Sequence, residues 1–257
     1  SFMKIGYVQN EVKFGDKKYN FDSVKNLLQG AIADLIIVPE LFATGYTFTS
    51  KDEAFDLAEI AGKGETTDFL IDLAKSTKAV IVGGFVEKEN EKVYNSALIV
   101  DENGVIDTYR KIHLFNKEKL WFSPGNKELK VYEKNGFKFG VMICFDWIFP
   151  EVTRTLALKG ADIIAHSTNL VMPYCQKAMV TRCLENRVFA VTANRIGREH
   201  RGEDDFNFTG ASQITAFNGD ILASAPIDKE DMVIVEIEHT LARNKNINNF
   251  NNIFEDR

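Results

Sequence analysis

Continuous apolar runs recur along the chain and predict strands that are buried on both faces. Leu35–Val38 and Ala79–Phe85 are two such runs in the first third of the sequence. Lys138–Ile143 and Asp162–Ala165 are two more, and Pro150 lies between them, where a helix is expected to begin. Because strands of this kind occur in parallel sheets that helices cover, the pattern predicts an α/β fold.

Helical spacing of apolar residues predicts the helices that accompany these strands. The helical segments are expected around Phe21, Val24, Leu27, Leu28 and Ile32, over Thr66–Ala74 and Cys175–Asn186, and from Pro150 to about Lys159. Further strands are expected at Lys4–Val8, Phe189–Ala193, Val233–Ile237, around the turn Asn218-Gly219, and in two hairpins, Asn95–Val100 with Val105–Tyr109 and Val131–Tyr132 with Lys138–Ile143.

Nothing in the sequence divides the chain into units. There is no Pro/Ser-rich linker, no internal repeat and no shift of composition, so we expect one domain over residues 1–257. Ser1 and Phe2 precede Met3 and are interpreted as a cloning remnant, and no structure is predicted for them. Residues from about 243 to 257 include an Asn-rich stretch, and we expect them to form a C-terminal arm that lies over a partner subunit.

Charge and hydropathy exclude several classes of partner. The chain has 31 basic and 37 acidic residues, a net charge of −6, which argues against nucleic acid or an anionic membrane as partner. No apolar stretch reaches the ~18 residues that a membrane span needs, and no signal-peptide pattern is visible. The three cysteines are too few and too scattered for a disulfide framework, so we expect a cytoplasmic protein.

Three residues are candidates for catalysis because of where they lie. Cys144 follows a predicted strand and precedes a helix, a place where a nucleophile can be exposed, although a lone cysteine there is more often buried and inert. Glu40 follows the carboxyl end of a buried strand, where it could also cap a helix or form a surface ion pair. Lys111 ends a hairpin strand and taken alone could be a solvated lysine.

The combination of these side chains has a chemical logic that none of them has alone. A cysteine needs a base to form a thiolate, and a carboxylate can serve if burial raises its pKa. A lysine nearby favours the thiolate and stabilises an oxyanion formed later. A papain-like cysteine hydrolase would instead need a His/Asn partnership, and none of the four histidines has suitable flanks. His113 and His166 are expected to satisfy hydrogen bonds within the fold, and the scattered histidines predict no metal site.

The flanks of the three residues resemble the motifs of the nitrilase superfamily, the carbon–nitrogen hydrolases. The matching segments are Val38–Tyr46, Tyr109–Phe115 and Gly140–Glu151, in that order, and the resemblance continues through Leu184–Arg187 and Ala242-Arg243. It implies a four-layer α-β-β-α sandwich that pairs through a two-fold interface, so we expect a homodimer or a larger homo-oligomer. No metal and no organic cofactor is implied.

The same resemblance implies the role of each matching residue. Glu40 would take the thiol proton, and Cys144 would attack the substrate carbon. Lys111 and the backbone N–H of Phe145 would hold the developing negative charge. Glu118 matches a second glutamate that positions the lysine and the substrate. Because Glu118 lies between two lysines, an exposed charged loop remains an alternative.

Substrate contacts are expected from three further positions. Tyr46 and Trp147 could line the pocket or simply pack. The nucleophile motif here is similar to that of the branch of the family that hydrolyses ω-amides of dicarboxylic acids, but Ile148 stands where that branch has an arginine. An apolar residue cannot pair with a substrate carboxylate, so we expect a neutral substrate. Arg195 or Arg198 could still reach the pocket from a loop and supply the missing charge.

The sequence therefore predicts a cysteine-dependent hydrolase of non-peptide C–N bonds. Its expected substrate is a small neutral amide, converted to acid and ammonia through a thioester. A nitrilase that forms a thioimidate and an N-carbamoyl amine hydrolase remain open, because all three substrates present an electrophilic carbon to one thiol. From a different class, a catalytically silent binding module is the alternative that the intact Glu40, Lys111 and Cys144 count against.

Overall fold

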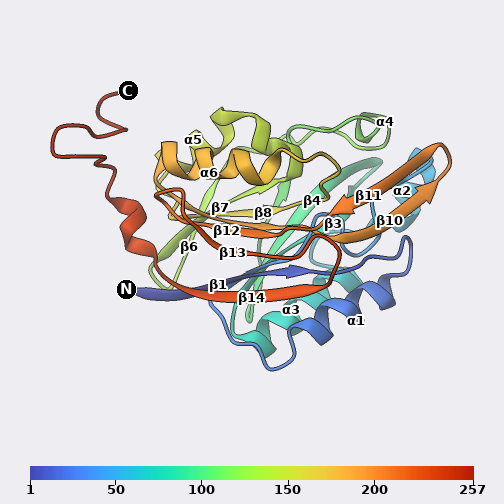
Figure 1. The fold of residues 1–257 in the computed structure, drawn as a ribbon. Coiled ribbons are helices and arrows are strands. Elements are labelled where there is room, and N and C mark those ends of the chain that lie inside the picture. Colours follow the sequence, from blue (N-terminus) through green and yellow to red (C-terminus); the bar gives the residue numbers. More distant parts are fainter.

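Two six-stranded sheets packed face to face form the centre of the computed structural model, which describes residues 1–257. Helices cover the outer face of each sheet, as Figure 1 shows. A core of buried apolar side chains from both sheets, among them Ile5, Val80, Phe139 and Val191, lies between the layers. The predicted four-layer α-β-β-α architecture is confirmed.

The first sheet has the strand order β14-β1-β2-β3-β4-β5. Its strands are β1 Phe2–Gln9, β2 Leu35–Ile37, β3 Val80–Glu89, β4 Lys92–Asp101, β5 Gly104–Arg110 and β14 Asp231–Glu238. Strands β1, β2 and β3 are parallel, whereas β4, β5 and β14 are antiparallel to their neighbours. The loops after β2 and β5 therefore come from one sheet.

The second sheet has the order β13-β12-β9-β8-β7-β6. Its strands are β6 Val131–Lys134, β7 Phe137–Ile143, β8 Ile163–Ser167, β9 Phe189–Ala193, β12 Gln213–Thr215 and β13 Ile221–Ser224. The central strands β7, β8 and β9 are parallel, so their carboxyl ends share one edge. A separate hairpin, β10 Ile196–Arg201 with β11 Asp204–Thr209, projects from the body in Figure 1.

The helices occur as pairs that cover opposite sheets. α1 Lys17–Leu27 and α3 Glu65–Thr77 lie on the first sheet, and α5 Pro150–Leu158 and α6 Cys175–Asn186 lie on the second (Figure 1). Their buried apolar faces hold them there, because removing this surface from water stabilises the packed state. The shorter helical segments are α2 Lys51–Leu57, α4 Glu118–Trp121, and the 3-10 turns η1 Cys144–Ile148 and η2 His239–Arg243.

Several expected boundaries are wrong. α1 begins at Lys17, where the Asp16 side chain caps it, and ends at Leu27, so Ile32 lies outside the helix and is exposed. Phe2, for which no structure was predicted, belongs to β1 and pairs with Glu238. The helix expected from Pro150 is confirmed as α5, and the 3-10 turn η1, which was not predicted, lies between β7 and this helix. The sequence analysis also missed α2 and the β10–β11 hairpin.

Residues 244–257 follow η2 and lie outside the layers in Figure 1. They keep some contact with the body: Lys245 Nζ donates to the carbonyl oxygens of Asn186 and Arg187, and Lys245 lies over the Phe254 ring. Phe254 near the end of the arm also packs against the core and lies beneath Arg154, so both ends of the arm contact their own chain. None of the helices is long and apolar enough to cross a lipid bilayer.

Candidate active site

The candidate site forms where the two sheets present the ends of their strands to each other. Glu40 follows β2 and Lys111 follows β5 in the first sheet, whereas Cys144 follows β7 in the second. The backbone N–H of Glu40 donates to the carbonyl oxygen of Thr168, just beyond β8, and this bond joins the two sheets. Gly84 of β3 lets the backbone of Glu40 pack closely against that strand, because a Cβ at position 84 would lie 2.7 Å from Glu40 Cα.

A buried lysine lies between two buried carboxylates. Lys111 Nζ is 2.8 Å from Glu40 Oε2 and 2.8 Å from Glu118 Oε1. The Asn95 side-chain amide donates to the same two oxygens, at 2.8 Å and 3.2 Å. These contacts leave Glu40 Oε1 as the one carboxylate oxygen of the cluster without a hydrogen-bond partner. Glu118 is only 2% exposed, so it does not belong to an exposed charged loop.

Burial and charge set the protonation of this cluster. Burial raises the pKa of Glu40 to about 7, although the Lys111 charge opposes the shift. Burial alone would lower the pKa of Lys111, but the carboxylates of Glu118 and Glu40 outweigh it and raise that pKa. Lys111 therefore stays cationic, and Glu40 can exchange a proton near neutral pH.

Cys144 occupies a strained turn at the start of η1, with a φ of 43°. Burial raises the pKa of its thiol well above the usual value, and the Glu40 charge raises it further. Lys111 and the backbone N–H of Asn169 act in the opposite direction. Lys111 therefore favours the thiolate, as expected, but its effect is smaller than those of burial and Glu40. The resting thiol is neutral and needs a base when it reacts.

Asp146 anchors the turn that carries Cys144. Its carboxylate accepts hydrogen bonds from the Ile143 backbone N–H (3.0 Å), the Tyr109 hydroxyl (2.5 Å) and His113 Nδ1 (2.8 Å). Tyr109 lies two residues before Lys111 and His113 two residues after it, at the end of β5 in the first sheet. The turn with the thiol and the segment with the cation are thus bound to one carboxylate.

His166 supports the same turn from β8. Its Nε2 donates to the Cys144 carbonyl oxygen at 2.9 Å, and its Nδ1 lies 3.1 Å from the Thr192 hydroxyl. Burial lowers the pKa of His166 to about 4, so the ring is neutral at physiological pH. This histidine has both ring nitrogens in use and acts as a support for the backbone.

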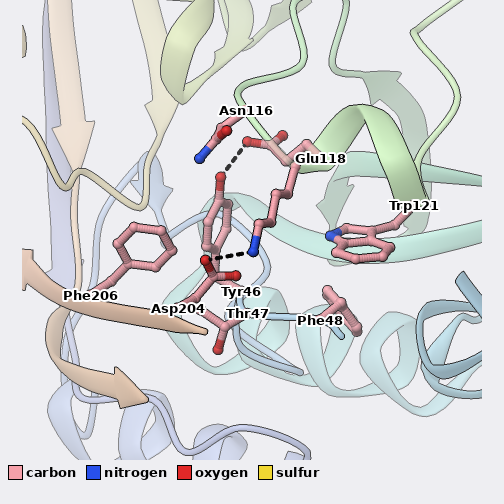
Figure 2. A pocket seen from close by; sticks show the side chains of 9 residues that line it. Tyr46, Thr47, Phe48, Asn116, Glu118, Trp121, Asp204 and Phe206 are labelled. Carbon is pink, nitrogen blue, oxygen red and sulfur yellow. Dashed lines mark hydrogen bonds and ion pairs between the residues drawn. The ribbon is translucent and has the colours of Figure 1, made fainter. Parts of the chain in front are cut away.

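Tyr46 contacts the cluster through Glu118. Its hydroxyl donates to Glu118 Oε2 at 2.6 Å, as Figure 2 shows. The backbone N–H groups of Tyr46 and Thr47 donate to the buried Glu199 carboxylate, which also pairs with Arg195. Tyr46, predicted to contact substrate, therefore lies where it orients Glu118.

A small, mainly apolar cavity adjoins the thiol. Its lining residues include Cys144, Phe145, Trp147, Asn169, Leu170 and Met172. Phe145 and Trp147 thus lie where the sequence predicted substrate contacts. Cys144 is 8% exposed, whereas Cys175 and Cys183 are more deeply buried.

Ile148, which was predicted to contact the substrate, and the two arginines that the sequence left open do not line this cavity. Ile148 is 41% exposed and is not among the residues that line the cavity. Arg195 is buried against Glu199, the Val12 carbonyl oxygen and the Phe208 ring. Arg198 pairs with Asp205 on the projecting hairpin. Ile148 therefore lies outside this cavity, and neither of the two arginines that the sequence left open supplies a charge to it.

Sequence reasoning missed Asn95, Asp146 and Asn169. Asn169 had a usable signal, because it follows the β8 strand end just as Glu40 follows β2, and ligand sites gather at such ends. Asp146 also had a signal, because it lies within the matching segment Gly140–Glu151, but no role was assigned to it. Asn95 had none, because it lies within a strand.

Comparisons with known proteins agree with this geometry. The model of the carbon–nitrogen hydrolase family matches residues 4–245. The chain is 46% identical to a nitrilase of Pyrococcus abyssi over 99% of this chain and 97% of that one. It is 31% identical to an (R)-stereoselective amidase of a Pseudomonas species, over 90% and 84% of the two chains. It is 34% identical to an N-carbamoylputrescine amidase of Solanum lycopersicum, over 79% and 74%.

A solved structure extends the likeness to the fold. The Xanthomonas campestris carbon–nitrogen hydrolase superfamily protein, described with an arsenic adduct in its active site, superposes with a TM-score of 0.84. The two share 25% sequence identity over 95% of this chain and 94% of that one. The chain therefore belongs to the nitrilase superfamily of carbon–nitrogen hydrolases and is an enzyme that acts on C–N bonds.

Proposed function

We propose that this enzyme hydrolyses a small neutral amide to the corresponding acid and ammonia through a thioester on Cys144. The observation that carries the proposal is the arrangement of Lys111 between Glu40 and Glu118, beside a thiol that needs a base. Glu40 keeps one oxygen free and has a pKa of about 7, as a general base requires.

The first half of the reaction forms the thioester. Glu40 takes the Cys144 proton as the sulfur attacks the carbonyl carbon, and the oxygen of the tetrahedral intermediate becomes negative. Lys111 and the backbone N–H of Phe145 stabilise this oxyanion. Glu40 then returns the proton to the nitrogen, the C–N bond breaks, and ammonia leaves with the acyl group bound to sulfur.

The second half restores the enzyme. Water attacks the thioester carbon while Glu40 accepts one of its protons, and the same two donors stabilise the second oxyanion. The C–S bond breaks, the sulfur recovers the proton from Glu40, and the acid departs. Glu118 contributes by holding Lys111, which it contacts through both oxygens at 2.8 Å and 3.1 Å.

The cavity favours a neutral substrate. Its lining is mostly apolar, and neither Arg195 nor Arg198 contributes to it. A substrate carboxylate would lose its hydration there without a compensating cation, at a cost of several kcal/mol by order of magnitude. Neutral amides are therefore preferred over ω-carboxylated ones, a conclusion that now depends on the whole cavity and not on Ile148.

Nitrile hydrolysis is the second candidate, and the 46% identity to the Pyrococcus abyssi nitrilase favours it. The same thiol would add to a nitrile carbon and form a thioimidate. An N-carbamoyl amine is the third, supported by the relative of Solanum lycopersicum. Both alternatives use the same catalytic residues as the amidase reaction, and they differ from it in the substrate that occupies the cavity. These residues are Glu40, Lys111, Glu118 and Cys144.

An ammonia-release screen separates these candidates. Neutral amides, nitriles, N-carbamoyl amines and ω-carboxylated amides of matched chain length are compared by kcat/KM, with the Cys144→Ala protein as blank. We expect the neutral amide to be the fastest substrate. Faster turnover of the nitrile, the carbamoyl amine or the carboxylated amide would overturn the proposed substrate class.

A further inference from the structure

Asn169 is a buried amide whose polar atoms have no partner within the protein. It is 3% exposed, and neither its Oδ1 nor its Nδ2 makes a hydrogen bond. Its side chain lines the cavity beside Cys144, and its backbone N–H faces the Cys144 sulfur. A buried polar group without a partner is costly, so its retention at this place indicates that a ligand completes it.

A second unpartnered acceptor belongs to the same site. Glu40 Oε1 is buried and free, because Lys111 and Asn95 both contact Oε2. The Glu40 backbone is hydrogen-bonded to Thr168, the neighbour of Asn169, so the two side chains start from adjacent backbone. No partner fixes the Asn169 amide plane, and its oxygen is free to turn toward the reacting group.

We propose that Asn169 Oδ1 and Glu40 Oε1 together recognise the two N–H groups of a primary amide. The carbonyl oxygen of such a substrate is directed to Lys111 and the Phe145 N–H, which leaves its amino group for these two acceptors. A primary amide or a terminal ureido group supplies two N–H donors, an N-alkyl amide supplies one, and a nitrile supplies none. Asn169 is thus a specificity-determining residue that selects primary amides.

The inference rests on the proposed amidase function and gives it a finer substrate class. A site built to hydrogen-bond a substrate N–H discriminates strongly against an analogue that lacks it, because its own polar groups are then left unpaired. Without the Asn169 oxygen, the amide would lose this advantage while the nitrile would lose nothing. The quantity to follow is therefore the ratio of kcat/KM for amide and nitrile.

The test compares a primary amide, its N-methyl amide and the nitrile of the same acyl group. Asn169→Leu keeps the approximate size and removes both polar atoms, and Asn169→Ala is the second variant in case leucine does not fit. We expect kcat/KM for the primary amide to fall about 10- to 100-fold, the worth of one buried hydrogen-bonding group. The values for the N-methyl amide and the nitrile should change less than about threefold.

Asn10→Leu is the matched control. Asn10 is also fully buried with an unpartnered Oδ1, but it does not line the cavity, so the ratio should stay at the parent value. An equal fall for all three substrates, or no fall for the amide, in a variant that unfolds like the parent would overturn the role of Asn169 alone. A parent enzyme that hydrolyses only the nitrile would overturn the proposed function and this inference with it.

Discussion

The hydroxyl of Tyr46 donates a 2.6 Å hydrogen bond to Glu118, the second carboxylate, with Glu40, that holds Lys111. Hydrogen bonds to a charged group contribute about 1.5–3 kcal/mol. Tyr46 is itself fixed through its backbone by Glu199. The position of the lysine ammonium therefore depends on a chain of contacts that begins outside the cavity.

Tyr46→Phe should lower kcat about tenfold while KM changes less than threefold. The variant keeps the ring and removes the hydrogen bond that orients Glu118, so Lys111 is held less firmly when the oxyanion forms. Tyr132→Phe is the matched control, because Tyr132 donates a similar 2.7 Å bond to Asp107 away from the site. Steady-state kinetics of both variants check this, and equal effects would show that loss of stability is the cause.

Glu40→Gln should reduce kcat/KM on the order of 10²–10⁴-fold, the usual contribution of a general base. Glutamine keeps the shape but cannot take the thiol proton. Glu87→Gln removes charge from another buried glutamate, the partner of Arg110, and should retain activity to within tenfold. Activity of Glu40→Gln close to that of the parent would mean that another group accepts the proton.

The pH dependence of kcat/KM should follow the ionisation of Glu40. Only the unprotonated carboxylate can act as base, and burial raises its pKa to about 7. Activity should therefore be low below pH 6, increase about tenfold per pH unit there, and level off above pH 8. A profile measured from pH 5 to 9 checks this; an increase centred near pH 4.5 would indicate an unshifted carboxyl group.

The enzyme should form a homodimer or a larger homo-oligomer in solution. Leu158, Leu184 and Leu241 are exposed on α5, α6 and η2, and Phe250 of the arm is almost fully exposed. Large apolar side chains left in water favour association, and a symmetric pair is the commonest form that it takes. Light scattering at micromolar concentration measures the state, and a monomer would contradict the prediction.

Truncation tests the contribution of the arm. A chain that stops after Lys245 keeps the ion pair between Arg243 and Asp162, and it loses Phe250. We expect this variant to dissociate at higher concentrations than the parent, with a smaller change in its free energy of unfolding. An unchanged dissociation constant would exclude the arm from the interface.

The sequence predicted the strands and the three central residues because their signals are local. Apolar runs identified β3, β7 and β8, and the family motifs around them marked Glu40, Lys111 and Cys144. Glu118 was also placed by its motif, although its burial depends on packing that no local pattern shows. The polar hairpin β10–β11 lacked an apolar run and was missed.

Ile148 shows why spacing from a motif is an unsafe guide to contacts. Residues 144–148 form a 3-10 turn, in which side chains three positions apart lie on the same side. Trp147 therefore shares the side of Cys144 and borders the cavity, whereas Ile148 is rotated away toward the surface. The sequence placed Cys144 at a turn before the helix at Pro150 but gave no conformation for that turn, and this conformation decides which side chains border the cavity.

Asp146 has a consequence for how the enzyme tolerates motion. The thiol and the ammonium come from different sheets, and small sliding movements between packed layers would ordinarily change their separation. Because Asp146 bonds both its own turn and the residues on either side of Lys111, the two reactive groups are carried together when the layers shift. A sliding movement that separated the thiol from the ammonium would therefore have to stretch these hydrogen bonds, which gives the two sheets a restraint at the point where the reaction occurs.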